Sequence, residues 1–192
     1  RLAEFGKQLT VLLKSGPAAD VESLTMLRET ILQHDRQSRE RRRLERVDMS
    51  IRLVRWLRQC DTDQAPVSLA EAAAFQLSDG GFIDWARLTL RSGDAVRELS
   101  EAYSKLFDAV TVIREQQCKR FAELLRDWTA AKTSDAIVVP VEQILEQIVA
   151  PIAAELPVLV IVIDGMSVAV FRELMADVLG HDWLLLAEEA HG

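Results

Sequence analysis

The sequence predicts a mainly α-helical protein, with a helical bundle region followed by the opening strand, helix and strand of an α/β domain. Three observations predict this. Apolar residues recur at spacings of three and four along most of residues 1–155, which indicates amphipathic helices. One of these apolar series, over residues 94–131, contains no Gly or Pro and so predicts a single long helix. Residues 158–163 are six consecutive branched apolar residues, which is typical of a strand buried on both faces.

Composition and cysteine usage place the chain among soluble cytoplasmic proteins. It has 192 residues, of which 49% are hydrophobic, and this is enough for a sizeable core. The longest apolar run has six residues, whereas a membrane span needs roughly 20, so we predict no membrane segment. Cys60 and Cys118 show no Cys-x-x-Cys spacing, which favours reduced thiols in the cytoplasm. The chain begins without Met inside a helical pattern, and we expect it to be part of a longer protein.

The first helices follow from spacing and from break signals. The first helical pattern stops at residues 16–17, a Gly-Pro pair, and the second starts near Asp20. Thirteen residues separate Ile31 from Leu44, so the apolar face stays in phase across a polar middle at 3.6 residues per turn. We therefore predict one long helix to about residue 58, with a break near residues 33–38 as the alternative.

Capping residues place the later helices. Ser68 and Glu71 form a capping box that starts a short helix over residues 69–77. Gly80 and Gly81 are predicted to end it before another short helix, and the long helix over residues 94–131 follows. A further helix begins at Pro140, since proline is favoured in a first turn.

An arginine run in the first half is a candidate contact surface. Residues 36–58 hold nine arginines against three acidic residues, although the whole chain has a net charge of −7. Arginine grips phosphate and carboxylate groups well because its planar fork can bond two oxygens together. The run therefore predicts a contact with nucleic acid or an acidic protein surface, and the alternative is a solvated helix face. The residues that would make this contact are Arg39, Arg41, Arg42, Arg43 and Arg46.

Asp164 is the candidate metal ligand. It directly follows the predicted strand over residues 158–163 and precedes Gly165. Open α/β sheets bind their ligands at the carboxyl ends of the strands, and an ionised Asp offers two oxygens to a divalent cation. The alternative is that Asp164 only stabilises the turn before the glycine.

Ser167 has two interpretations. A helix predicted over residues 168–178 follows it, so Ser167 can serve as the N-cap. Residues 165–169 also follow the strand, G-x-S-x-small, helix plan of a serine hydrolase, in which Ser167 would be the nucleophile. Ala169 stands where that plan usually has Gly, and only His181 and His191 follow as a base, so we favour the N-cap. We interpret His34, His181 and His191 as surface residues, and predict a second strand over residues 183–186.

Several stretches resemble the PglZ family, the alkaline-phosphatase-superfamily component of phage growth limitation and BREX bacteriophage-defence systems. Residues 158–167, which include Asp164 and Ser167, are similar to the start of the PglZ domain. Residues 80–87, 121–129 and 139–142 resemble the helical region before that domain in the BREX type 2 branch. The resemblance implies that residues 1–155 are a helical region and that residues 156–192 open an alkaline-phosphatase-like α/β domain.

The resemblance also implies an activity and its limits. PglZ-like proteins resemble metal-dependent phosphatases or nucleases that hydrolyse phosphoesters, and the Asp that ends their first core strand binds one of two divalent metal ions, expected to be zinc. This assigns a metal-binding role to Asp164 alone. The nucleophile and the other ligands lie in later segments of the family, so no catalytic residue is assigned to this chain. We expect residues 1–192 by themselves to bind no metal tightly and to hydrolyse no phosphoester.

Partners follow from the same resemblance. The expected partners are other components of a phage-defence complex, which the helices of residues 1–155 would contact. A protein in which these helices only dock partners, with no chemistry at Asp164, is a further alternative. Charge reversal at the arginine run and salt-dependent binding distinguish this alternative from a solvated helix face.

Overall fold

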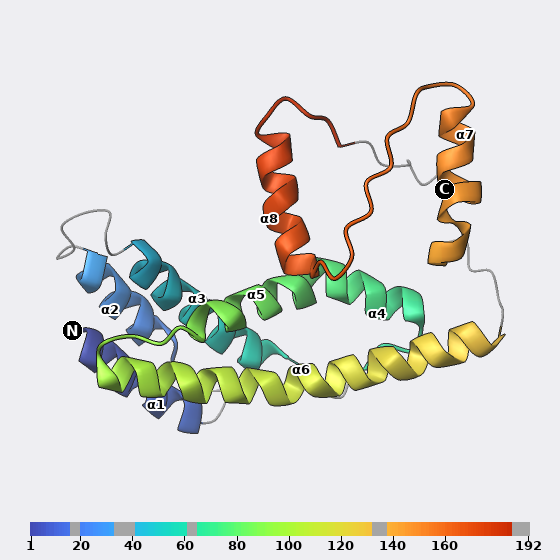
Figure 1. Cartoon of the computed structure of the whole chain (residues 1–192). Coiled ribbons are helices and arrows are strands. Elements are labelled where there is room, and N and C mark those ends of the chain that lie inside the picture. The colour runs from blue at the N-terminus through green and yellow to red at the C-terminus, as the bar shows by residue number, and fades with distance from the viewer. Residues whose placement is uncertain (16–19, 33–40, 61–64, 132–137, 186–192) are drawn as a thin grey trace.

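The computed structural model describes residues 1–15, 20–32, 41–60, 65–131 and 138–185, and these residues form helices without any β-strand (Figure 1). The mainly α-helical prediction is therefore confirmed. The helices are, in chain order, α1 (Leu2–Lys14), α2 (Glu22–Leu32), α3 (Arg41–Gln59), α4 (Leu69–Phe75), the π-helix η2 (Gln76–Gly80), α5 (Gly81–Leu90), α6 (Arg97–Ala131), the 3₁₀-helix η3 (Val141–Gln143), the π-helix η4 (Leu145–Val149), α7 (Ala150–Ala153) and α8 (Val168–Leu179).

Helices α1, α3, α4 and α5 all pack against α6, whose unbroken apolar pattern predicts a long buried face. Leu99, Tyr103, Leu106 and Val110 lie on one face at spacings of three and four, and all are fully buried. Helix α1 lies along this face (Figure 1). Gly6 allows the close approach, because a Cβ at this position would lie 2.5 Å from the carbonyl oxygen of Glu98.

Helices α2 and α3 fold back on each other, so the prediction of one continuous helix is wrong and the alternative with a break is correct. The guanidinium of Arg28 bonds the carboxylate of Asp48 at 2.7 Å. In a continuous helix these residues would be about 30 Å apart, at 1.5 Å per residue. Residues 33–40, which connect the two helices, are all polar, so they provide no apolar face for a longer helix. Leu24 of α2 and Val47 of α3 are both fully buried in the core.

The N-cap predicted at Ser68 is confirmed, although Glu71 bonds Val67 instead of the Ser68 N–H that a capping box requires. The predicted break after α4 is wrong. The side chain of Ser68 accepts a hydrogen bond from the backbone N–H of Glu71 at 3.2 Å, and the Glu71 carboxylate accepts one from Val67 at 2.9 Å. Beyond Phe75 the chain continues through the π-helix η2 directly into α5. Gly80 and Gly81 both have right-handed helical backbone angles, so here glycine serves close packing and does not end the helix.

The predicted strands are not formed in the described residues, and this corrects the α/β part of the fold prediction. Residues 158–163 are an extended segment whose side chains are exposed, from 40% for Val158 to 86% for Val162. A strand needs a neighbouring strand for its backbone hydrogen bonds, and residues 138–185 supply none. Residues 183–185 of the second predicted strand likewise lie outside any helix or strand, and residue 186 lies outside the described residues.

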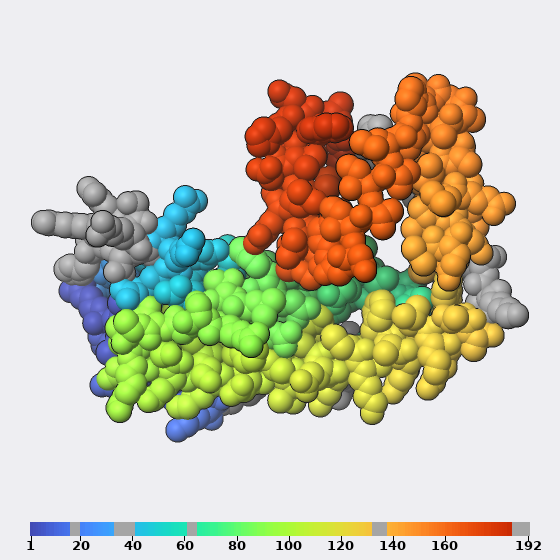
Figure 2. Space-filling view, in the orientation of Figure 1, coloured from blue at the N-terminus to red at the C-terminus, as the bar shows by residue number. Residues whose placement is uncertain are grey.

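The C-terminal elements stand away from the helical core. Helices α7 and α8 stand apart from each other on the same side of the core in this view, and the extended segment runs between them (Figures 1 and 2). Neither Cys60 nor Cys118 forms a disulfide in this structure. No helix among the described residues combines the length and the apolar composition that a bilayer span requires.

Candidate functional site

The structure places Asp164 in an exposed turn between the extended segment and α8. Gly165 follows with a φ of +72°, a left-handed conformation that favours glycine, so the chain can turn sharply after the carboxylate. The turn lines a shallow hollow of about 390 Å³ together with Ile163, Val170 and Leu174. Asp164 is the one charged residue among the described residues that line this hollow.

One carboxylate can form only part of a metal site. Within the described residues no three His, Cys, Asp or Glu side chains come together as a metal-binding group. Zinc sites in proteins need at least three protein ligands, and Asp164 contributes one. The donor chemistry of Asp164 fits a divalent cation, and the other ligands would have to come from outside the described residues.

Ser167 is the N-cap of α8, as predicted. Its hydroxyl oxygen accepts a hydrogen bond from the backbone N–H of Val170 at 3.3 Å. His181, the one histidine in the described part of the chain, lies beyond the opposite end of the 12-residue helix, about 18 Å away at 1.5 Å per residue. The His181 Nδ1 is 2.8 Å from the carbonyl oxygen of Asp177 in the last turn of α8, so the imidazole lies at the end of the helix opposite to Ser167. His34 and His191 are outside the described residues.

Helix α8 is attached to the core at the junction of η2 and α5. The Arg172 guanidinium donates hydrogen bonds to the backbone carbonyl oxygens of Leu77 and Ser78, the latter at 3.1 Å. Val168 packs directly on Gly81, where an added Cβ would lie 2.6 Å from the Val168 Cγ1. The sequence interpretation missed this contact, because the adjacent glycines, its only signal, were interpreted as a helix end.

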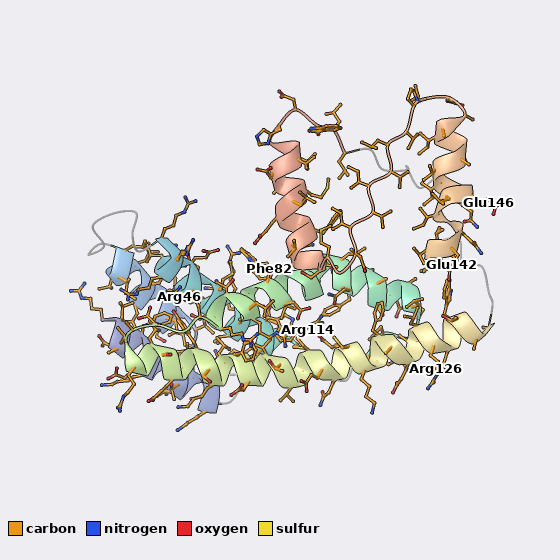
Figure 3. The ribbon with its side chains drawn as sticks, in the orientation of Figure 1. Arg46, Phe82, Arg114, Arg126, Glu142 and Glu146 are labelled. Atoms are coloured by element: carbon orange, nitrogen blue, oxygen red, sulfur yellow. The ribbon has the colours of Figure 1, made fainter. Side chains whose placement is uncertain are left out.

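A buried arginine fixes the same junction from the other side. Arg114 of α6 is 2% exposed and donates two hydrogen bonds to the Asp84 carboxylate, at 3.0 and 3.1 Å (Figure 3). It also donates to the amide oxygens of Gln76 at 2.6 Å and Gln117 at 2.7 Å. The sequence analysis did not single out Arg114, although it falls four residues after Val110 on the buried face of the helix.

The arginine run is only partly available as a contact surface. Arg43 and Arg46 bond the Asp94 carboxylate at 2.7 and 3.4 Å, and this carboxylate is fully buried. Burial opposes ionisation of Asp94, but hydrogen bonds from the Val96 N–H and the two guanidinium groups outweigh it and lower the pKa of Asp94. Arg41 and Arg42 are exposed, and Arg39 lies outside the described residues.

A larger cleft of about 780 Å³ lies between the C-terminal end of α3, helix α4 and the middle of α6. Three aromatic side chains, Trp56, Phe75 and Phe121, contribute to its lining. Its charged residues are bonded within the protein. Arg114 is held by the network above, and the Arg120 Nε donates to the Pro66 carbonyl oxygen at 3.0 Å. Glu71, the third charged residue of the described lining, accepts from the Val67 N–H, so each charged side chain of this lining has a partner within the protein.

Comparisons with known proteins do not assign this chain to a class, so its function has to be inferred from its own residues. No family model matches the chain, and no curated protein or solved structure matches it. The PglZ resemblance and the metal-binding role of Asp164 therefore stay predictions.

Proposed function

We propose that this chain is the helical region and the opening segment of a cytoplasmic, metal-dependent phosphoester hydrolase of the PglZ type, and that Asp164 is one of its metal ligands. The observation that carries the proposal is the exposed Asp164 turn between an unpaired apolar segment and a capped helix. A carboxylate between a strand and a helix is in the position where α/β sheets bind ligands.

The unpaired segment supports an α/β domain that other residues complete. Residues 158–163 carry six branched apolar side chains, and all of them are between 40% and 86% exposed. Exposing this much contiguous apolar surface is unfavourable, and an extended backbone without partners is a template for strand pairing. Strands from outside the described residues would satisfy the backbone and bury both faces, and this would make the segment a central strand that ends at Asp164.

The chemistry assigned to Asp164 is limited to holding the metal ion. When bound, a pair of divalent ions can activate the attacking oxygen and stabilise the leaving oxygen of a phosphoester. Asp164 would supply one carboxylate to this pair, and the glycine turn after it would keep the carboxylate exposed at the end of the strand. No nucleophile is assigned within residues 1–192.

Hydrolysis of a phosphodiester by the protein with its complete α/β domain tests the proposal. Asp164→Asn keeps the shape of the side chain but removes its charge, so zinc-dependent turnover should fall by at least ~100-fold while the melting temperature stays unchanged. The matched control is Glu173→Gln, which neutralises an exposed carboxylate of α8. Full turnover in Asp164→Asn would refute the assignment.

Partner binding is a second proposed function, and the exposed pair Arg41 and Arg42 favours it. These residues begin α3, and their charges face solvent, while Arg43 and Arg46 bond Asp94. The partner would be an acidic face of another component of a phage-defence complex. Reversing Arg41 and Arg42 to Glu should weaken a pull-down of this component, and the wild-type interaction should weaken as salt rises. Binding that is indifferent to both changes would refute this role.

A further inference from the structure

Helix α8 is held to the rest of the molecule by a small contact. Of its 12 residues, all described, only Ala169 is buried, with 7% of its surface exposed. The contact partners are on α5 and the preceding π-helix η2. Figure 1 shows α8 standing with its first turn on the junction between α4 and α5. Because few residues hold α8 on the core, each of these contacts strongly affects the orientation of the helix.

The π-helix η2 supplies backbone acceptors for this contact. A π-helix places one extra residue in a turn, which shifts the hydrogen-bond register of a helix and is frequent at functional sites. The carbonyl oxygens of Leu77 and Ser78, both in η2, accept from the Arg172 guanidinium. Arginine suits this task because its fork can bond two oxygens, and its charge strengthens both bonds. The exposed side chain of Arg172 therefore links α8 to the backbone of the core.

The buried Arg114 network fixes η2 in place. Arg114 joins Gln76, the first residue of η2, to Asp84 of α5, and its guanidinium lies 5.7 Å from the centre of the Phe75 ring. An added Cβ at Gly80 would lie 2.4 Å from the Gln76 amide oxygen, so it would displace the oxygen that accepts from Arg114. The carbonyl acceptors for Arg172 thus belong to a turn whose geometry is set by buried bonds to α6.

Gly81 sets the distance between α5 and α8. An added Cβ there would lie 2.6 Å from the Cγ1 and 3.0 Å from the Cβ of Val168. The first distance is too short for a real contact and the second is tight, so Val168, with the start of α8, would have to shift. The backbone of Gly81 is helical, and alanine would suit α5 itself better than glycine does. A substitution to Ala therefore acts on the docking of α8 and leaves α5 intact.

We propose that η2 and Gly81 form a seat for α8 that positions the Asp164 turn, with Arg172 as a positioning residue. Asp164 lies only four residues before Val168, so a shift of the first turn of α8 moves the carboxylate with it. This inference deepens the proposed function: the role of the seat in placing Asp164 rests on that function. The seat itself rests on the contacts of Arg172 and Val168.

Methyl NMR on the methionines of this chain tests the seat directly. The four methionines are well placed, because Met166 lies in the turn and Met175 in α8, while Met26 and Met49 in α2 and α3 are internal references. Gly81→Ala and Arg172→Ala should shift the Met166 and Met175 signals toward their random-coil positions and leave the other two unchanged. Arg172→Lys should retain part of the wild-type shifts, and adding Val168→Ala to Gly81→Ala should restore them by making room.

A matched control removes an arginine that has no role in the seat. Arg126 is exposed on α6 and bonds its neighbour Asp127, so Arg126→Ala should leave all four methionine signals unchanged (Figure 3). Wild-type signals in both Gly81→Ala and Arg172→Ala would overturn the seat. Equal changes at Met26 and Met49 would also overturn it, because they would show general loss of structure.

Turnover of the protein with its complete α/β domain separates the seat from the proposed function. Misplacement by about 1 Å can cost on the order of 100-fold in rate, so Arg172→Ala should lower kcat by roughly 10- to 100-fold with KM little changed and Arg172→Lys should recover most of it. Shifted methionine signals with wild-type kcat would overturn the positioning role and leave the proposed function standing. If the variants shift the methionine signals but the wild-type protein hydrolyses no phosphoester, the proposed function is refuted and the seat remains as a docking contact alone.

Discussion

Replacing Arg114 with Met should destabilise the helical core through the buried network that joins α6, η2 and α5. Methionine keeps most of the side-chain length but cannot donate hydrogen bonds to Asp84, Gln76 or Gln117, which Arg114 bonds at 2.6 to 3.1 Å. The cost comes mainly from the partners that stay behind, since a buried acceptor without a donor keeps its full desolvation penalty.

The size of the effect follows from the surroundings of Asp84. Breaking a fully buried ion pair by removing one partner costs about 3–5 kcal/mol. Asp84 keeps 24% of its side chain exposed and has Arg87 as a second partner at 3.3 Å, so the lower end of this range applies. A loss of about 3 kcal/mol corresponds to a fall of roughly 6–12 °C in melting temperature for a chain of this size.

Urea unfolding followed by far-UV circular dichroism measures this loss. The control is Arg126→Met on the exposed part of the same helix, and it should leave the unfolding midpoint unchanged, because Arg126 is 72% exposed. Asp84→Asn combined with Arg114→Met should cost less than the sum of the two single changes, since both remove the same ion pair. A loss below about 1 kcal/mol in Arg114→Met would contradict the network's role in stability.

Three further changes test the core. Asp94→Asn should destabilise the fold at neutral pH: a lowered pKa means that the ionised carboxylate of Asp94 stabilises the fold above about pH 4 and that this stability is lost as pH falls further. The variant's melting temperature should therefore fall less in acid than the wild type's, and an equally steep fall would be evidence against the buried ion pair. Burial raises the pKa of Tyr103, so wild-type stability should decline above about pH 10. Tyr103→Phe should reduce this decline in alkaline urea titrations, and an unchanged decline would argue against it. Gly6→Ala should destabilise the fold by about 1–3 kcal/mol, because its Cβ would meet the Glu98 backbone at 2.5 Å. Wild-type stability in thermal melts of that variant would show that α1 can move away from α6.

The sequence predicted correctly those elements that depend on neighbouring residues along the chain. The 35-residue helix α6 has an unbroken apolar series, and tertiary contacts had only to add burial to it. The N-caps at Ser68 and Ser167 were predictable because each depends on a residue three positions further along the chain. The same holds for Asp164, whose turn follows from the glycine after it.

Long-range contacts decided the features that the sequence analysis missed. Periodicity reports the face of a helix but not its continuity, so the matching phase of Ile31 and Leu44 gave no sign that α2 and α3 fold back on each other. Gly80 and Gly81 look like a helix end, but a neighbouring helix and a buried arginine require their lack of a side chain. The six-residue apolar segment has the composition of a central strand, and a strand forms only where a neighbour supplies hydrogen bonds.

The metal ion itself gives the most direct test of the proposed function. Anomalous X-ray diffraction at the zinc absorption edge, on crystals of the protein with its complete α/β domain, locates any bound zinc without reference to activity. We predict an anomalous peak about 2.0–2.2 Å from a carboxylate oxygen of Asp164, the usual zinc–oxygen distance, and loss of this peak in Asp164→Asn. A zinc site elsewhere in the protein, with the Asp164 carboxylate unbound, would contradict the proposal.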